Sequence, residues 1–222
     1  GWSSIIGRLI VAINQLNVEI YASSKVESIN LQNKIIKSVT VNGQKINCDK
    51  LILAIPPLET SYLLKKANMK TFELDSCHQE SCAALDVAIE AKVMSPYSGL
   101  FDLNSGIIAI DMAQKDRIPS GRKPTECSII HAVNLRGDGD DALEEIKLFL
   151  DSRCSGWRKY AAKRRSSPSI MIHPCSSDER VDASIYYDSG IILAGPHVIS
   201  DYTLSDAAVS TGRNVSKLLN IH

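Results

Sequence analysis

The chain has 222 residues, enough for one large domain or two small ones. Its 25 lysines and arginines balance its 25 aspartates and glutamates, so its charge gives no support to nucleic-acid binding or to an anionic membrane surface. No apolar stretch approaches the roughly 20 residues of a membrane-spanning helix. The start at Gly1 has no signal-peptide layout, so we expect a cytoplasmic protein without a transmembrane segment.

Six cysteines are scattered along a chain that is long enough to build its own core. We therefore expect reduced, partly buried thiols rather than a disulfide framework. Cys77, His78 and Cys82 approach the spacing of metal ligands, but a structural zinc site needs a second close pair that the sequence lacks. We expect no metal.

The N-terminal part predicts one helix followed by short strands. Residues 3–16 place isoleucines and leucines at helical spacing, and Asn17 can end the helix. Alternating residues then predict strands, with Asn42-Gly43 as a hairpin turn. These strands cover residues 18–21, 25–31, 34–41 and 44–46.

A continuous apolar run follows at residues 50–55 and stops at Pro56-Pro57. Such a run is typical of a strand buried on both faces inside a parallel sheet. Residues 58–79 predict a connecting helix with loops.

The middle of the chain predicts strands, a polar loop at residues 114–125 and the longest helix at residues 140–160. That helix begins acidic and ends basic, which complements the helix dipole. We therefore interpret the basic run at 157–165 as a solvated helix end and not as a nucleic-acid contact. The other expected elements are strands at 81–90, 107–112, 128–135, 169–173, 185–187 and 190–194, and a final helix at 205–220.

One apparent nucleotide motif lies at Gly137–Ala142, which satisfies G-x-G-x-x-A between a strand and a helix. The motif works when bare backbone N–H groups face a pyrophosphate. Here Asp138, Asp140 and Asp141 would surround the phosphates with like charge. We interpret the segment as a polar turn with an acidic helix start.

Near the C-terminus an apolar strand runs into Gly195, a short loop follows, and a helix opens at Asp206 with Ala207 and Ala208. This order resembles the closing element of the FAD-dependent amine oxidase and phytoene desaturase superfamily. Residues 205–213 are similar to that family's Asp-Gly-Ala-x-x-Ser-Gly-Arg pattern. The plainer interpretation of these residues is a small-residue helix packed against a sheet.

The N-terminal part extends the resemblance over nearly the whole chain. In that superfamily a mid-chain helix leads to a strand whose valine touches the adenine end of FAD, then to a small three-stranded sheet, and then to a strand that ends in an Ala-x-Pro turn. The matching positions are residues 4–9 for the helix, Val26 for the adenine contact and residues 54–57 for the turn. The resemblance implies FAD contacts at Val26, Ala54, Pro56, Gly195, Asp206, Ala207 and Ala208.

The small residues have a physical purpose in that pattern. Ala207 and Ala208 let the start of a helix approach a ligand closely. The free N–H groups and the positive end of the helix dipole can then stabilise negative charge on a reduced flavin.

The chain departs from the family at two places. Pro196-His197 stands where the family carries an acid that meets the ribityl and pyrophosphate region, and proline also removes a backbone donor. The strand, Gly-rich loop and helix that cradle the diphosphate have no counterpart in the sequence. We therefore expect FAD in the complete protein and no tightly held FAD in this chain alone.

These features predict an α+β fold, as a fragment of a two-domain α/β flavoprotein. We expect a partial FAD-binding domain at residues 1–66 and 189–222, and a substrate domain at 67–188 built on a mainly antiparallel sheet with helices. The resemblance implies a phytoene-dehydrogenase-like or amine-oxidase-like oxidoreductase that passes hydride from a C–C or C–N bond of a small molecule to flavin.

The Gly-rich segment would come from the same gene or from a partner subunit, and the chain would be inactive alone. The alternative is a non-catalytic α+β binding module that no longer binds FAD, which Pro196 favours. No catalytic residue is predicted, because His131 and His173 are interpreted as structural histidines.

Overall fold

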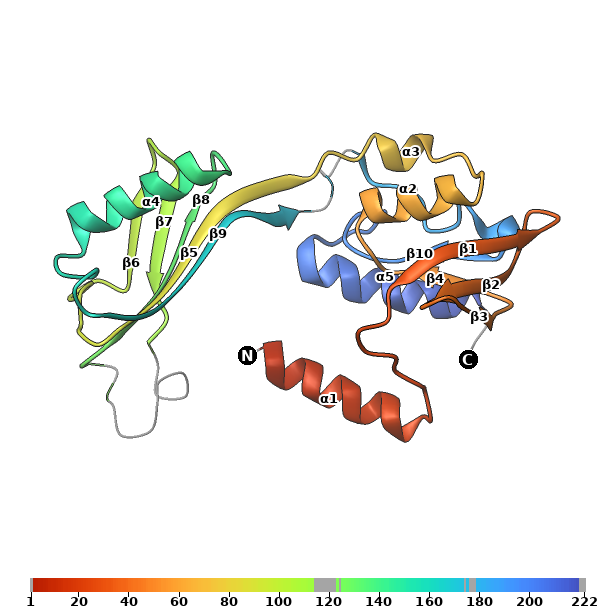
Figure 1. The fold of residues 1–222 in the computed structure, drawn as a ribbon, viewed down its shortest axis with the longest axis horizontal. Coiled ribbons are helices and arrows are strands. Elements are labelled where there is room, and N and C mark those ends of the chain that lie inside the picture. Colours follow the sequence, from red (N-terminus) through yellow and green to blue (C-terminus); the bar gives the residue numbers. More distant parts are fainter. Residues whose placement is uncertain (1, 114–122, 124, 174, 176–178, 220–222) are drawn as a thin grey trace.

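The structure is a computed structural model that describes residues 2–113, 123, 125–173, 175 and 179–219. The predicted α+β class is confirmed. The chain forms two lobes that are joined by long strands (Figure 1). We name them the discontinuous lobe, residues 2–75 and 179–219, and the sheet lobe, residues 80–173.

A three-stranded antiparallel sheet in the order β1-β2-β3 belongs to the discontinuous lobe. The predicted hairpin turn joins β2 to β3, with Asn42 and Gly43 at φ 50° and 74°. Both angles lie in the left-handed region that a two-residue hairpin turn requires. The strands are β1 Val26–Gln32, β2 Ile35–Val41 and β3 Gln44–Asn47.

A short parallel pair lies beside this sheet. The apolar run forms β4, Leu51–Leu53, which pairs in parallel with β10, Ile191–Leu193. The predicted burial on both faces is wrong at Ile52, which is 45% exposed. Among the described residues β10 is the only strand paired with β4, so the other edge of β4 is unpaired.

Helices pack around these two sheets (Figure 1). They are α2 Pro57–Lys66, α3 Phe72–Asp75, the 3-10 turn η2 Tyr187–Ser189 and α5 Leu204–Leu218. The lobe's main core contains residues of both chain segments: Ile36 and Leu64 come from the first, and Ile191 and Val198 from the second. The prediction of a strand at 185–187 is wrong, because Ile185 lies in a turn that leads into η2, and Tyr187 is the first residue of η2.

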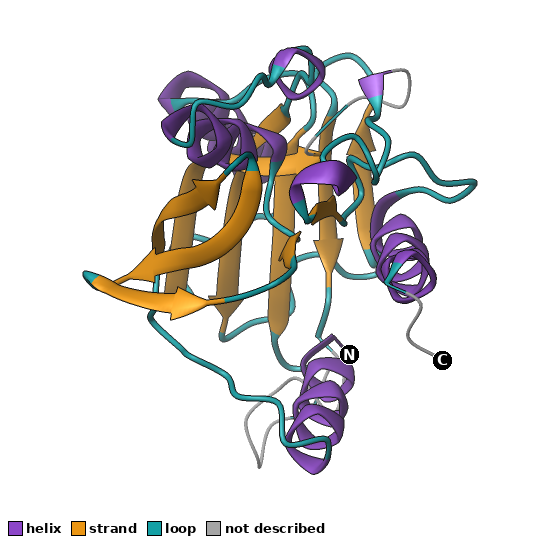
Figure 2. Cartoon of the chain, turned by 90° about the vertical axis from the view of Figure 1, so that its right-hand side faces the viewer, coloured by secondary structure: helices purple, strands orange, loops and turns teal. Residues whose placement is uncertain are grey.

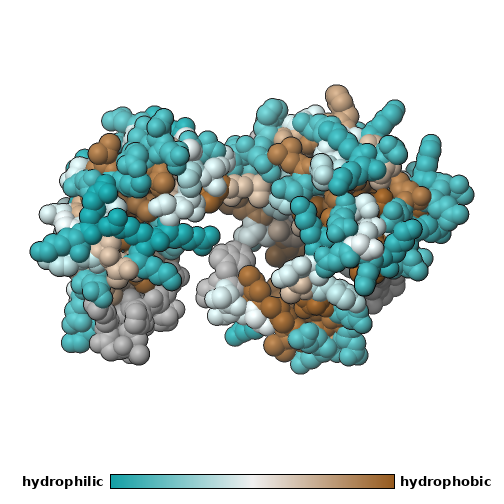
Figure 3. Space-filling model, in the orientation of Figure 1, coloured by the Kyte–Doolittle hydropathy of each residue, from teal (hydrophilic) through white to brown (hydrophobic). Residues whose placement is uncertain are grey.

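The first helix, α1 Trp2–Gln15, is confirmed, and Asn17 ends it at φ 54°. The strand expected at 18–21 is wrong, because this exposed segment pairs with no described strand. Figures 1 and 2 show α1 standing apart from the sheets, and Figure 3 shows apolar surface on it. Ile5, Ile6 and Leu9 are 50–57% exposed.

The sheet lobe is a five-stranded antiparallel sheet in the order β6-β7-β8-β5-β9, with α4 packed on one face. Strand β6 was not expected from the sequence. The strands are β5 Glu80–Ile89, β6 Gly99–Asp102, β7 Ile107–Asp111, β8 Ser128–Asn134 and β9 Ala161–His173, and the helix is α4 Asp140–Arg153.

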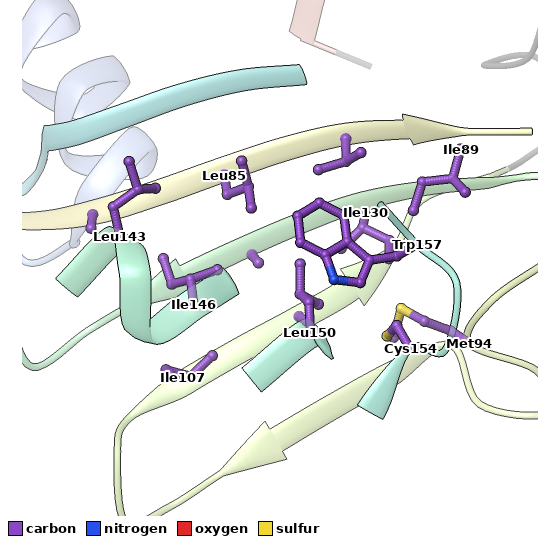
Figure 4. Close-up of a cluster of buried hydrophobic side chains, with 14 of the residues drawn as sticks. Leu85, Ile89, Met94, Ile107, Ile130, Leu143, Ile146, Leu150, Cys154 and Trp157 are labelled. Carbon is purple, nitrogen blue, oxygen red and sulfur yellow. The ribbon is translucent and has the colours of Figure 1, made fainter. Parts of the chain in front are cut away.

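The core between α4 and the sheet contains Leu85, Ile130, Ile146, Leu150 and Trp157 (Figure 4). Trp157 is 1% exposed and donates a hydrogen bond from Nε1 to Asp151 at 2.8 Å. The interpretation of residues 157–165 as a helix end is therefore wrong.

The helix stops at Arg153, well before the predicted residue 160, and β9 starts at Ala161. Two cations of the basic run stack on the buried indole, since the guanidinium groups of Arg158 and Arg164 lie 4.7 and 5.1 Å from the Trp157 ring.

Three further expectations concern the polar loop, the cysteines and membrane-spanning helices. The loop at 114–125 falls largely outside the described residues. All six cysteines are free, and all but Cys48 are buried. Within the described part of the chain, no helix is long and apolar enough to cross a membrane.

Candidate functional site

The site begins where β10 ends. Ala194 is buried, and Gly195 follows at φ 134°, a conformation that other residues adopt only with strain. A Cβ built on Gly195 would lie 2.9 Å from Cε1 and Nδ1 of the His197 ring. Only glycine therefore lets the turn and this ring approach so closely.

Thr211 fixes the turn against helix α5. It is 1% exposed, and its Oγ1 accepts a hydrogen bond from the Gly195 N–H at 3.0 Å and donates one to the Ala207 carbonyl at 2.8 Å. The end of β10 and the first turns of α5 are thus held together. Sequence reasoning missed Thr211, although its position four residues after Ala207 places both on one helix face.

The start of α5 leaves its backbone donors open. Thr203 precedes the helix without forming a side-chain cap hydrogen bond, and Leu204 adopts φ 52°, which is unusual for a bulky residue. Ala207 is fully buried against the Thr211 contact, and Ala208 is half-buried. The uncapped N–H groups and the helix dipole make this end favourable for negative charge.

A hollow of about 370 Å³, which we name the turn hollow, lies at this helix start. Its walls come from three parts of the fold: the segment after β4, the end of β9, and the turn leading into α5. They are mostly apolar. The lining residues are Ala54, Ile55, Pro56, Met171, Ile172, Ala194, Gly195, Pro196, His197, Leu204, Ser205 and Ala208.

A second hollow of about 810 Å³, the strand hollow, lies along β4 between β1 and α2. It shares Ala54, Ile55 and Pro56 with the turn hollow, so the two hollows meet at the end of β4. Val26 lines the strand hollow, together with exposed apolar residues such as Ile52 and Leu58.

Of the seven predicted site residues, five line one or both of these hollows and two line neither. Gly195 and Ala208 line the turn hollow, Val26 lines the strand hollow, and Ala54 and Pro56 line both. Ala207 is buried behind the helix start, and Asp206 is exposed and lines neither hollow.

His197 lines the turn hollow and was singled out in the sequence only as a departure. It is 1% exposed, and its Nε2 has no hydrogen-bond partner in the described part of the chain. Burial lowers the pKa of the imidazole to about 4, so the ring is neutral at physiological pH. Buried polar atoms without a hydrogen-bond partner are rare in folded proteins.

The motif at Gly137–Ala142 lies elsewhere. Gly139 precedes α4 at φ 92°, and Asp138 accepts hydrogen bonds from the hydroxyls of Ser81 and Ser169. These bonds lower the pKa of the Asp138 carboxyl, which keeps it ionised. The segment borders a separate hollow of about 740 Å³ on the sheet lobe, which also contains Glu145. The carboxylates there agree with the polar turn inferred from the sequence.

The two histidines considered earlier lie in other contexts. His131 bonds through Nδ1 to Asp86 across the β5–β8 pair and remains half exposed. His173, at the end of β9, accepts a hydrogen bond from the Cys175 N–H at 3.2 Å. Neither lines the turn hollow or the strand hollow.

No family model matches the chain, and no curated protein matches it significantly in sequence. Solved structures do match its fold. An oxidoreductase from Methanosarcina mazei matches 98% of this chain and 54% of its own, with a TM-score of 0.75 and 15% identity. A protein assigned as protoporphyrinogen oxidase, from Exiguobacterium sp. 255-15, matches 99% of this chain and 51% of its own, with a TM-score of 0.69 and 18% identity.

An FAD-dependent oxidoreductase from Pseudomonas aeruginosa matches 89% of this chain and 53% of its own, with a TM-score of 0.50 and 10% identity. The fold is one that FAD-dependent oxidoreductases share. The chain spans about half the length of the solved structures that it matches.

The chemistry of the turn hollow fits the flavin end of FAD. The hollow has apolar walls, an uncapped helix start and a glycine whose Cβ would fill the turn. The diphosphate is less well matched, because no cationic side chain lines the turn hollow within the described residues.

Proposed function

We propose that this chain supplies the substrate domain and the C-terminal part of the FAD domain of a flavin-dependent oxidoreductase. The complete enzyme oxidises a C–C or C–N bond, as phytoene-dehydrogenase-like and amine-oxidase-like enzymes do. Residues 1–66 and 189–222 belong to the FAD domain, and residues 67–188 to the substrate domain.

The observation that carries this proposal is the helix start at the turn hollow. Thr211 holds the Gly195 turn against α5, and the first N–H groups of α5 are left without a side-chain cap. Few structural purposes require an uncapped helix start beside an apolar hollow. A flavin edge that gains negative charge on reduction is stabilised by such an arrangement.

FAD, when bound, supplies the acceptor for the hydride of the substrate. The chain's own residues contribute binding and orientation. The small side chain of Ala208 leaves space at the helix start, and the apolar Ile55, Pro56 and Ile172 keep water away from it. Met171 and Ile172 at the end of β9 complete the apolar wall of the hollow.

The remaining FAD contacts come from a segment outside this chain's sequence. The unpaired side of β4 and the apolar strand hollow beside it offer a place for a parallel strand with a Gly-rich turn. A parallel sheet of two three-residue strands is too small to be stable alone, which favours this addition.

The test is to express the whole gene product that carries this chain, with any neighbouring gene for a Gly-rich βαβ protein. We expect the purified protein to contain about one FAD per chain, read from its flavin absorbance after denaturation. Residues 1–222 alone are expected to be colourless. Flavin-free whole protein, after supply of FAD, contradicts the proposal.

The second candidate is a binding module of the same fold that no longer holds FAD. Pro196 favours it, since this position provides no backbone N–H and no carboxylate beside the turn hollow. A folded whole protein without flavin, and without binding of added FAD, is the outcome expected of this candidate.

A further inference from the structure

A run of positive charge lies on the sheet lobe. The sequence from 152 to 177 contains six lysines and arginines and no aspartate or glutamate, although the formal charge of the whole chain is zero. The run is not a helix end, because α4 ends at Arg153 and the other five cations follow it. These five lie in the loop around Trp157 and in β9.

Two of these cations have partners within the fold. The Arg158 guanidinium forms an ion pair with Asp151 at 2.7 Å and lies over the Trp157 ring. Arg164 stacks on the same ring and donates a hydrogen bond from Nη2 to the Arg158 carbonyl at 3.0 Å. These contacts hold the loop between α4 and β9 against the core.

The other cations of β9 are not neutralised. Lys163 and Arg165 form no ion pair with a described residue. Asp86 lies opposite Arg165 in the β5–β9 register, but its carboxylate is bonded to Nδ1 of His131. With Arg164 between them, they place three successive cations on one strand. Such a surface is complementary to a partner that carries negative charge.

The backbone of this segment is open on one side, because β9 is an edge strand of the sheet (Figure 1). Residues 162–166, which we name the basic edge, are exposed at every position. Strand residues alternate in the direction of their backbone groups. Glu90 of the β5 segment donates its N–H to the carbonyl that directly precedes β9, and Asp86, four residues earlier and opposite Arg165, points the same way. The backbone of Arg165 therefore points to β5, and that of Ser166 points away from it.

The open part of the edge ends at Pro168. There the carbonyl accepts a hydrogen bond from the Gly139 N–H at 2.7 Å, so the start of α4 covers the strand. No described residue outside the sheet bonds to the backbone of Arg164 or Ser166. Free N–H and C=O groups on an edge strand can pair with another extended chain. The cations oppose pairing with a second copy of the same edge and favour an acidic chain.

We propose that the basic edge binds an extended acidic segment of a partner protein, which adds to β9 as a further strand. The backbone groups of the edge supply hydrogen bonds, and the side chains of Lys163, Arg164 and Arg165 supply the complementary charge. A nucleic acid is less well matched, because the Trp157 ring is buried beneath two guanidinium groups and is not free to stack on a base. The inference goes beyond the proposed function, because it requires no FAD.

The test uses labelled peptides and the whole gene product that carries this chain. The probe is an octapeptide of alternating Glu and Val with a fluorescein label, whose acidic side chains share one face when it is extended. A Glu-Pro octapeptide has the same charge but cannot form a strand ladder. Fluorescence anisotropy at low salt is expected to show about tenfold tighter binding of the Glu-Val peptide. About 0.5 M sodium chloride should weaken the binding strongly.

Charge reversal identifies the surface that binds. Lys163→Glu combined with Arg165→Glu is expected to weaken binding of the Glu-Val peptide by about tenfold or more. The matched control is Lys37→Glu combined with Lys45→Glu, which alters two exposed lysines on strands of the discontinuous lobe. It changes the net charge equally, so binding should stay within about threefold of wild type if the basic edge is the site.

A proline separates strand pairing from simple charge attraction. Ser166→Pro removes the N–H that points away from β5, whereas Ser166→Ala keeps it. We expect the proline variant to bind the Glu-Val peptide about tenfold more weakly and the alanine variant to stay within about threefold of wild type. If Ser166→Pro fails to fold, the comparison of the two peptides on wild-type protein decides.

The opposing outcomes are distinct. Wild-type protein that does not bind the Glu-Val peptide at low salt overturns the inference, and so does equal binding by the charge-reversed variant. Equal binding of the Glu-Val and Glu-Pro peptides overturns the addition of a strand. Tighter binding of a labelled single-stranded DNA of the same length overturns the assignment to an acidic protein. The flavin content of the same preparation tests the proposed function separately.

Discussion

His197 shows how a single residue can tie stability to pH. Its pKa falls from 6.5 in the unfolded chain to about 4 in the fold, because burial disfavours the charged ring. Between these values the unfolded state binds more protons than the folded state. The contribution of the neutral ring to the free energy of unfolding is therefore fully present above pH 6.5, and it is lost as the pH falls toward 4.

We expect the wild-type chain to lose on the order of 3 kcal/mol over this interval through His197, since each pKa unit corresponds to about 1.4 kcal/mol. His197→Gln removes the titrating group, so its free energy of unfolding should fall less between the same pH values. Urea denaturation at a series of pH values measures both slopes. Above pH 6.5 the ring is neutral in both states, which isolates the cost of the substitution itself. Equal slopes for the two proteins would contradict the assigned burial.

Thr211 carries the second prediction at this scale. Thr211→Val keeps the shape of the side chain but leaves the Gly195 N–H without its acceptor at 3.0 Å. We expect a loss of about 1–3 kcal/mol in the free energy of unfolding, as for an unsatisfied buried donor. Thr203→Val is the matched control, because Thr203 is exposed and forms no cap hydrogen bond. Similar losses for both variants would mean that Thr211 does not hold the turn.

At the scale of elements, the sequence predicts best where a local signal fixes the backbone. Asn17 and Asn42-Gly43 lie in the left-handed region, and they mark the end of α1 and the β2–β3 turn as expected. The parallel pairing of β4 was foreseen from its apolar run. The two turn signals act within a few residues, whereas the apolar run indicates only a buried parallel strand, whose partner β10 lies near the other end of the chain.

The errors lie where distant contacts decide. The polar residues 163–168 do not alternate in hydrophobicity, yet they form β9 because β5 supplies a long antiparallel partner. Trp157 leaves the helix pattern because the core beneath α4 accepts its ring. At the site, the hydrogen bond between Gly195 and Thr211 spans 16 residues, and the helical spacing of Thr211 from Ala207 does not reveal that partner.

Helix α4 allows one substitution to be compared at two depths. Leu150 is fully buried against the sheet, whereas Leu148 in the same helix is 64% exposed. Leu150→Ala is expected to lower the free energy of unfolding by about 2–5 kcal/mol, because it leaves a cavity in the core. Leu148→Ala should change it by no more than about 0.5 kcal/mol. Chemical denaturation compares the two, and equal effects would show that α4 does not pack as described.

At the scale of the whole molecule, the two lobes depend on each other through two strands. β5 leaves the discontinuous lobe and β9 returns to it, and they pair from Glu80 with His173 to Ile89 with Ala161 (Figure 1). Met171 and Ile172 of β9 then reach the turn hollow. A movement of the sheet lobe relative to the discontinuous lobe would therefore alter the wall of the hollow.

Helix α1 gives the last prediction, because its apolar face contributes little to the described fold. Ile6 and Leu9 are 52% and 57% exposed, and the helix stands apart from the sheets (Figures 1 and 2). In residues 1–222, the double substitution Ile6→Glu and Leu9→Glu should change the free energy of unfolding by less than about 1 kcal/mol, since surface changes are small. It should also reduce self-association in sedimentation velocity, because a contiguous exposed apolar patch promotes association.

Leu53→Glu provides the buried control for this experiment, since Leu53 is 5% exposed in the parallel pair and a charge there has no partner. We expect a large loss in the free energy of unfolding of that variant, and this loss shows that the measurement detects a change at a packed leucine. If the α1 variant is destabilised by a similar amount, α1 packs on the body of the chain. If it is not, the apolar face is free to contact the segment that we propose to pair with β4, and the same two substitutions in the whole gene product should then lower its stability.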